Sequence, residues 1–98
     1  MAKEIVWTET AVRDRLLIYE FWLAHNQSNT YSEKLEVLFN ETAKLIAEYP
    51  EIGPVTDYKG IRVKIAGNHK LFYKLSAHQI EILRVWDTRQ NPAQLGLG

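Results

Sequence analysis

The side chains in this sequence that could do chemistry are mostly cations in its last third, where they alternate with apolar residues. Residues 61–65 read Ile-Arg-Val-Lys-Ile, and alternation with a period of two predicts a strand that is buried on one face. If the apolar residues of this strand face a core, Arg62 and Lys64 lie on the opposite face of the sheet. Further side chains are expected on that opposite face or at its rim: Lys70, Phe72, Lys74, Arg84 and Arg89.

A basic face of this kind has two interpretations. Cations can bind phosphates or an acidic peptide, while an aromatic side chain such as Phe72 or Trp86 stacks on a base or is covered by a partner. The same pattern also fits a solvated face of a sheet that binds nothing. Residue types alone leave both interpretations open.

The remaining titratable residues indicate no catalytic centre. His25, His69 and His78 fall in predicted loops or helix ends and form no cluster, so we expect each of them at the surface. Asp87 and Arg89 could be the acid and the cation of an active site. An Asp-x-Arg sequence after a strand is more often a salt bridge that stabilises a turn, and we favour that interpretation. No glycine-rich phosphate loop, His-Glu-x-x-His or Ser-His-Asp spacing occurs, so the motifs predict no enzyme class.

The composition of the chain excludes several classes of protein. Basic and acidic residues number 12 each, so the overall charge does not hold the chain on nucleic acid or on an anionic membrane. The absence of cysteine rules out disulfides, a thiolate nucleophile and cysteine-ligated zinc, and we expect no metal and no cofactor. We find no signal peptide and no segment of roughly 20 apolar residues that could span a membrane. We therefore expect a complete cytoplasmic protein.

The length of 98 residues is that of one domain, residues 1–98, in which helices and a sheet share one core. Apolar spacing and turn residues predict a strand at 5–7, helices at 10–25 and 30–49, and strands at 61–65, 70–75 and 80–86. The predicted fold is α+β: an N-terminal strand, an αα-hairpin and a three-stranded antiparallel meander, with the helices packed on one face of an antiparallel sheet. Residues 91–98 are expected to form a loose tail.

Each predicted helix has an apolar face. In the first helix, Val12, Leu16, Tyr19 and Leu23 recur at spacings of three or four, which predicts the side that packs on the core. In the second helix the apolar period continues for five turns, until Pro50 prevents the helix from continuing. The face of the first helix is widened by Ile18, Phe21 and Trp22.

Three stretches of the chain, in this order and at this spacing, resemble the RelE/ParE superfamily of toxins. Residues 7–23 are similar to the family's first strand and aromatic-ended helix, and residues 47–54 to its proline-ended second helix followed by a glycine. Residues 80–92 resemble its final strand and the arginine-containing segment after that strand. The resemblance covers nearly the whole chain, and the ParE branch is the closer match.

The resemblance implies a toxin that is neutralised by a cognate antitoxin in a toxin–antitoxin hetero-oligomer. ParE-like members inhibit DNA gyrase, whereas RelE-like members cut messenger RNA on the ribosome. Asp87 stands where many relatives carry histidine, and the late tyrosine of the nuclease branch would fall near Leu95, so RNA cleavage lacks an acid or base here. If the chain is a nuclease, the candidate catalytic residues are Arg62, Lys64, Lys70 and Arg89.

We therefore expect a ParE-like DNA gyrase inhibitor. A ribosome-dependent endoribonuclease is the second interpretation, and an inactive family member that only binds its antitoxin is the third. We expect the antitoxin to cover part of Phe72 and Trp86. The full set of residues expected to bind a partner is Arg62, Lys64, Lys70, Phe72, Arg84, Trp86 and Arg89.

Overall fold

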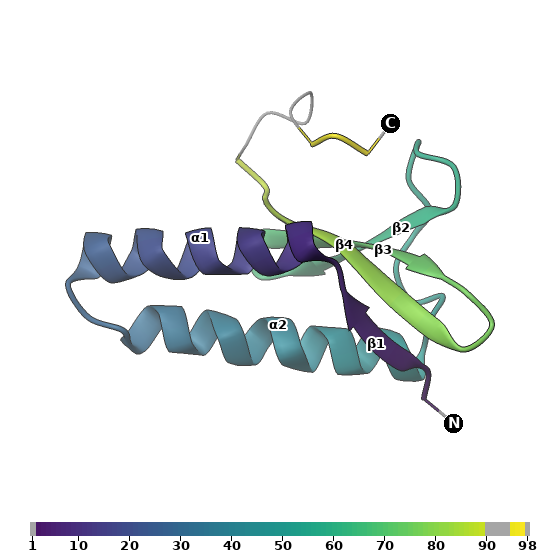
Figure 1. Cartoon of the computed structure of the whole chain (residues 1–98), viewed down its shortest axis with the longest axis horizontal. Helices are drawn as coiled ribbons and strands as arrows, with labels where there is room; N and C mark the ends of the chain where they lie inside the picture. Colours follow the sequence, from purple (N-terminus) through teal and green to yellow (C-terminus); the bar gives the residue numbers. More distant parts are fainter. Residues whose placement is uncertain (1, 90–94, 98) are drawn as a thin grey trace.

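Residues 2–89 and 95–97 are described by the computed structural model, and their elements follow the predicted order (Figure 1). The predicted bounds differ from those in the structure by at most one residue at either end. The elements are β1 (Glu4–Trp7), α1 (Glu9–Asn26), α2 (Thr30–Glu48), β2 (Ile61–Ala66), β3 (His69–Leu75) and β4 (Gln79–Asp87).

The four strands form one sheet in the order β1-β4-β3-β2. The meander of β2, β3 and β4 is antiparallel, whereas β1 pairs with β4 in parallel. A parallel pair needs a long crossover connection, and the helical hairpin with β2 and β3 provides it here. The predicted α+β fold, with an antiparallel meander and two helices packed on one face of the sheet, is confirmed, and the parallel pairing of β1 makes the sheet mixed.

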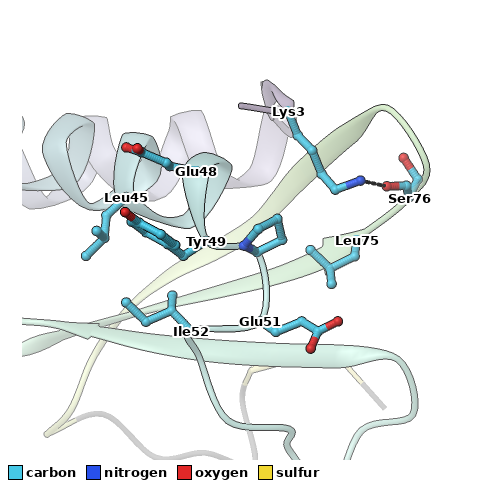
Figure 2. A pocket seen from close by; sticks show the side chains of 9 residues that line it. Lys3, Leu45, Glu48, Tyr49, Glu51, Ile52, Leu75 and Ser76 are labelled. Carbon is cyan, nitrogen blue, oxygen red and sulfur yellow. Dashed lines mark hydrogen bonds between the residues drawn. The ribbon is translucent and has the colours of Figure 1, made fainter. Parts of the chain in front are cut away.

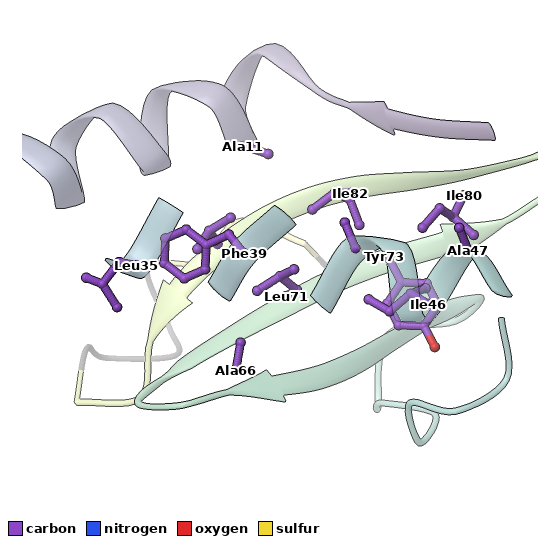
Figure 3. Packing of buried hydrophobic residues seen from close by; sticks show 12 residues of the cluster. Ala11, Leu35, Phe39, Ile46, Ala47, Ala66, Leu71, Tyr73, Ile80 and Ile82 are labelled. Carbon is purple, nitrogen blue, oxygen red and sulfur yellow. The ribbon is translucent and has the colours of Figure 1, made fainter. Parts of the chain in front are cut away.

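The main core lies between the helices and one face of the sheet (Figure 3). α2 has the expected apolar face, with Phe39 and Ile46 fully buried, and it ends at Glu48 just before Pro50. The sheet side of this core consists of Ala66, Leu71, Tyr73, Ile80, Ile82 and Val85.

The predicted inner side of α1 is wrong for Val12 and Leu16, which are 54% and 55% exposed. The helix packs on the core through Ala11, and through Ile18 and Trp22 as predicted. α1 is apolar around much of its circumference, so a spacing of three or four cannot distinguish the inner side from the outer one.

The prediction for the facing of β2 is also wrong. In the β2–β3 ladder Arg62 lies opposite Tyr73 and Lys64 lies opposite Leu71, and opposite residues in a ladder point to the same face. Because Tyr73 and Leu71 belong to the main core, Arg62 and Lys64 point toward the helix side of the sheet. The basic residues of β2 and the basic residues of β3 therefore lie on different faces.

A second, smaller apolar cluster covers the far face of the sheet, which is the face turned away from the helices. It consists of Ile61, Phe72, Trp86 and Leu95. Leu95 is only 2% exposed, so the predicted loose tail is wrong at this position, where the chain packs back on the sheet. Leu97 packs against the same cluster, whereas residues 91–94 and 98 of the predicted tail lie outside the described residues.

The loop that follows α2 is held by the hydroxyl of Tyr73. This hydroxyl accepts a hydrogen bond from the Gly53 N–H at 3.0 Å and donates one to the Pro50 carbonyl at 2.8 Å. Burial raises the pKa of the Tyr73 phenol, so the group keeps the proton that it donates. A Cβ atom at Gly53 would lie 2.4 Å from the carbonyl oxygen of Val63, so only glycine fits there. The loop is therefore fixed against the sheet.

We predict that Tyr73→Phe lowers the free energy of unfolding by about 1–3 kcal/mol, because it leaves the buried Gly53 N–H without its acceptor. Chemical denaturation with urea measures the change. The matched control is Tyr49→Phe, which removes a hydroxyl from a side chain that is 56% exposed and should change stability by less than about 0.5 kcal/mol. Equal losses in the two variants would contradict this account of the loop.

Candidate functional site

The cations predicted to form one basic face do not lie together. Lys70 pairs with Ile65 in the ladder and points, like Phe72, to the far face, whereas Arg62 and Lys64 point to the helix side. Of the predicted pattern, the alternation along β3 is confirmed and the single basic face is wrong.

Arg62 is used to hold the loop after α2. Its Nη1 donates a hydrogen bond to the carbonyl of Gly53 at 2.8 Å and a longer one to that of Glu51 at 3.4 Å. Arg62 and Tyr73, which are opposite each other in the ladder, thus bind the same short loop from adjacent strands. The Arg62 guanidinium therefore binds main-chain carbonyls of this loop.

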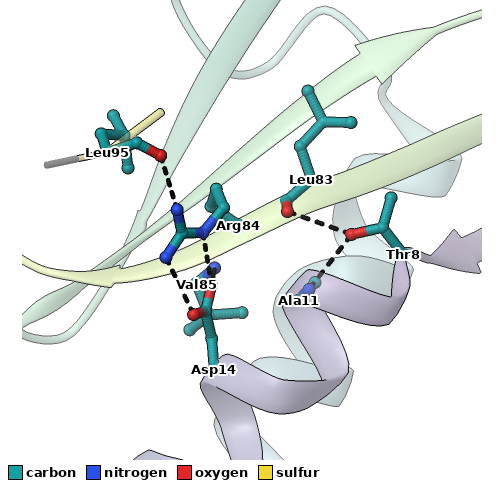
Figure 4. Close-up of polar contacts among 7 residues, drawn as sticks. All are labelled: Thr8, Ala11, Asp14, Leu83, Arg84, Val85 and Leu95. Carbon is teal, nitrogen blue, oxygen red and sulfur yellow. Dashed lines mark hydrogen bonds and ion pairs between the residues drawn. The ribbon is translucent and has the colours of Figure 1, made fainter. Parts of the chain in front are cut away.

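Arg84 joins three parts of the chain (Figure 4). Its Nε and Nη2 donate to the two carboxylate oxygens of Asp14 in α1 at 2.8 and 3.0 Å, and its Nη1 donates to the carbonyl of Leu95. The Asp14 carboxylate also accepts the N–H of Val85 at 3.0 Å. The guanidinium carbon lies 5.0 Å from the ring centre of Trp86, within cation–π range. A bidentate pair of this kind is specific and mostly shielded from water.

Asp87 and Arg89 form the salt bridge predicted from the sequence. Asp87 Oδ1 accepts the Arg89 N–H at 2.8 Å and Nε at 3.0 Å, and Oδ2 accepts Nη2 at 2.8 Å. The hydrogen bonds from Arg89 hold the pKa of the Asp87 carboxyl below its usual range, while the same contact raises the pKa of Arg89. The pair closes the turn at the end of β4, as expected.

Phe72 and Trp86 lie beneath the returning tail. Each is 6% exposed, and Leu95 belongs to the same apolar cluster. Among the described residues, the buried indole N–H of Trp86 has no hydrogen-bond partner. Contact between a partner and these two rings would require Leu95 to move.

His69 is buried, although the sequence predicted a surface position for it. The side chain is 2% exposed, stands edge-on to Phe39 at 5.2 Å between ring centres, and has no hydrogen-bond partner for either ring nitrogen in residues 2–89 and 95–97. Burial lowers the pKa of His69, Asp87 raises it and Arg89 lowers it, with burial the largest effect. His69 was expected in a turn, but it is the first residue of β3, where it lies opposite Asp87 in the ladder and against Phe39 of α2.

The exposed side of α1 carries two apolar pairs, Val12 with Leu16 and Leu17 with Phe21, which are 54–57% exposed. At 3.6 residues per turn the two pairs lie on opposite flanks of the helix, with the charged residues Arg13 and Glu20 exposed between them. A hollow of about 310 Å³ lies beside each pair, one lined by Leu16 and Trp7 and one lined by Phe21, His69, Asp87 and Arg89. Exposed apolar side chains grouped beside a hollow are candidate contacts with another protein.

Residues 2–89 and 95–97 hold no cluster of histidine, aspartate or glutamate side chains that could bind a metal ion. None of the helices in this part is long and apolar enough to cross a membrane.

Known structures share this arrangement of helices and sheet. A chain of the chromosomal ParDE toxin–antitoxin system from P. aeruginosa is 18% identical, with a TM-score of 0.77 over 88% of this chain and 96% of that one. A chain of the RelBE2 toxin–antitoxin complex from Mycobacterium tuberculosis is also 18% identical, with a TM-score of 0.58 over 89% of this chain and 99% of that one. At such identities the likeness shows the fold alone.

The sequence identifies the family. The family model described as the ParE toxin of the type II toxin–antitoxin system parDE matches residues 5–92, which run from the second residue of β1 through the whole of β4. The chain therefore belongs to the ParE toxin family and is the toxin of a type II toxin–antitoxin system. No curated protein sequence matches it significantly.

The buried histidine generates a prediction about pH. In the unfolded chain His69 has a pKa of about 6.5, and in the folded chain its pKa is lower. Below about pH 6.5 the unfolded state therefore takes up a proton that the folded state does not, and the stability from neutral His69 is lost as pH falls. We expect the free energy of unfolding to fall by up to about 1.4 kcal/mol per pH unit below that point.

Urea denaturation of the wild type and of His69→Phe at several pH values between about 5 and 8 measures this effect, and the variant should lose part of the pH dependence. His78→Gln, at an exposed histidine, is the control and should keep the wild-type pH dependence. If the two variants respond alike to pH, the burial of His69 does not control this dependence.

Proposed function

We propose that this toxin acts as a ParE-like inhibitor of DNA gyrase in the cytoplasm. One observation carries the proposal: Arg62, Arg84 and Arg89 all bind oxygen atoms of the chain itself. Cleavage of messenger RNA needs cations that are free to bind the reacting phosphate, together with a proton acceptor and donor. The engagement of these arginines supports gyrase inhibition over cleavage.

A ribosome-dependent endoribonuclease is the second candidate. Asp87 stands where many nuclease relatives carry histidine. His69 lies opposite Asp87 in the β3–β4 ladder, so the neighbouring strand places a histidine close to that position. This histidine is buried, and we therefore rank the nuclease below the gyrase inhibitor. A member that only binds its antitoxin is the third candidate.

The first experiment is to induce the chain alone in a bacterium and then together with the protein of the adjoining open reading frame. We expect arrest of growth in the first case and recovery in the second. The purified chain should block supercoiling by gyrase and leave messenger RNA on translating ribosomes uncut. Ribosome-dependent cuts that disappear in Lys64→Ala or Lys70→Ala, with gyrase unaffected, would reverse our ranking. Unchanged growth would support the inactive member instead.

We propose further that the cognate antitoxin binds along the outer side of α1. The exposed apolar pairs of α1, Val12 with Leu16 and Leu17 with Phe21, are uncovered in this structure, whereas Phe72 and Trp86 are already covered by Leu95. The hollow beside Phe21 is bordered by the Asp87–Arg89 salt bridge, whose charges balance, so we expect the contact there to be mainly apolar. Contact with the far face of the sheet remains the prediction made from the sequence.

We expect the double change Leu17→Asp and Phe21→Asp to weaken binding of the antitoxin at least about tenfold, because it puts two charges into an apolar interface. Titration calorimetry with the product of the adjoining reading frame measures the affinity. Val37→Asp on α2, where the side chain is 61% exposed, is the control and should bind like the wild type. If Leu95→Ser strengthens or weakens binding while the α1 variant does not, the antitoxin binds the far face.

A further inference from the structure

An apolar hollow of about 840 Å³ opens at the end of α2 (Figure 2). We call it the α2-end hollow. Tyr49 and Ile52 are 56% and 41% exposed at its surface, although both are large apolar side chains. Its apolar lining consists of Leu45, Tyr49, Pro50, Ile52 and Leu75.

The wall of this hollow is rigid. The Tyr73 hydroxyl and the Arg62 guanidinium hold residues 50–53 against the sheet, and the Ile52 N–H donates to the Tyr49 carbonyl at 2.9 Å. Because these contacts fix the loop, the positions of Tyr49 and Ile52 are set in the absence of a partner. A preformed apolar surface binds with little additional cost in ordering.

The charges at the rim of the α2-end hollow are mainly acidic. Figure 2 shows Glu48 on α2 and Glu51 on the loop at opposite sides of the apolar lining. Lys3 also lines the hollow, but its Nζ is directed to the carbonyls of Ser76 and Ala77 at 2.7 and 2.8 Å. A segment that enters between the two glutamates therefore meets carboxylates on both sides.

We propose that the α2-end hollow is a docking site for a segment of the toxin's cellular target. The segment that fits it is amphipathic, with one or two large apolar side chains flanked by lysine or arginine. The apolar side chains replace water over Tyr49 and Ile52, and the cations pair with Glu48 and Glu51. This inference rests on the proposed function, because it assigns the surface by which such a toxin reaches its target.

The acidic rim of the α2-end hollow favours the cellular target over the antitoxin as its occupant. The hollow beside Phe21 contains the paired charges of Asp87 and Arg89 and therefore does not repel an acidic partner. Glu48 and Glu51 give the α2-end hollow an acidic rim, which disfavours an acidic partner and favours a basic one. In Figure 1 the end of α2 lies at the opposite end of the helical hairpin from the loop that joins α1 to α2. Docking in the α2-end hollow therefore leaves the connected end of the hairpin uncovered.

The first test uses synthetic amphipathic peptides of about four helical turns. One has a leucine face flanked by lysines, and the matched peptide has glutamates in place of the lysines. We expect the lysine peptide to bind the full chain at least about tenfold more tightly and to shift the amide resonances of residues 49–52. Glu48→Lys with Glu51→Lys should reverse the preference. Equal affinity for the two peptides, or shifts confined to other regions, would overturn the proposal.

The second test uses Tyr49→Ser with Ile52→Ser, and Val37→Ser, two helical turns before Leu45, as the control. We expect the double variant to keep its thermal stability and its antitoxin affinity, to lose binding of the lysine peptide at least about tenfold, and to lose growth arrest. Loss of antitoxin binding would assign the hollow to the antitoxin and overturn the inference. Failure of the wild type to act on gyrase would contradict only the proposed function, since the peptide comparison does not depend on that enzyme.

Discussion

The fold depends on the way in which Asp14 joins α1 to β4. The parallel pairing of β1 with β4 ends at Ile82, and beyond that point the edge of β4 would have no neighbour. Asp14 takes the place of the missing strand, because its carboxylate accepts the N–H of Val85 and binds Arg84. The side chain of Thr8 adds a contact one turn earlier, where it caps α1 at Ala11 and donates to the carbonyl of Leu83. These contacts set which side of α1 faces the core.

This orientation determines what the surface offers to partners. With Ala11 turned inward, the larger residues Val12 and Leu16 are exposed, and α1 presents the apolar pairs that we assign to the antitoxin. Arg84, which binds Asp14 of α1, also binds the carbonyl of Leu95 through its guanidinium and lies over the ring of Trp86. The helix layer, the sheet and the returning tail are therefore linked through one arginine.

The second fixed region is the loop after α2, where a buried hydroxyl and an arginine hold a short turn of main chain. Such a turn could have been anchored with its apolar residues inward, yet Tyr49 and Ile52 point to solvent. The two surfaces differ in charge, since the Asp87–Arg89 pair beside the surface on α1 is balanced, whereas Glu48 and Glu51 border the hollow at the end of α2. Surfaces that differ in charge can select different partners.

The sequence alone determined the features that depend on neighbours in the chain. The order and bounds of the elements follow from apolar period and turn residues, Pro50 ends α2, Thr8 caps α1, and the Asp87–Arg89 bridge spans only two residues. Their physical causes are local, so the residues next to each feature are enough to predict it.

Only the tertiary structure decided which faces meet. Alternation separates the two faces of β2 but does not say which face meets the helices, and here both faces of the sheet are apolar, so Arg62 and Lys64 were placed on the wrong side. Asp14 and Arg84 are 70 residues apart, and His69 is buried because α2 places Phe39 against it. Such contacts form between segments that are distant in the sequence, so a local pattern of residues cannot predict them.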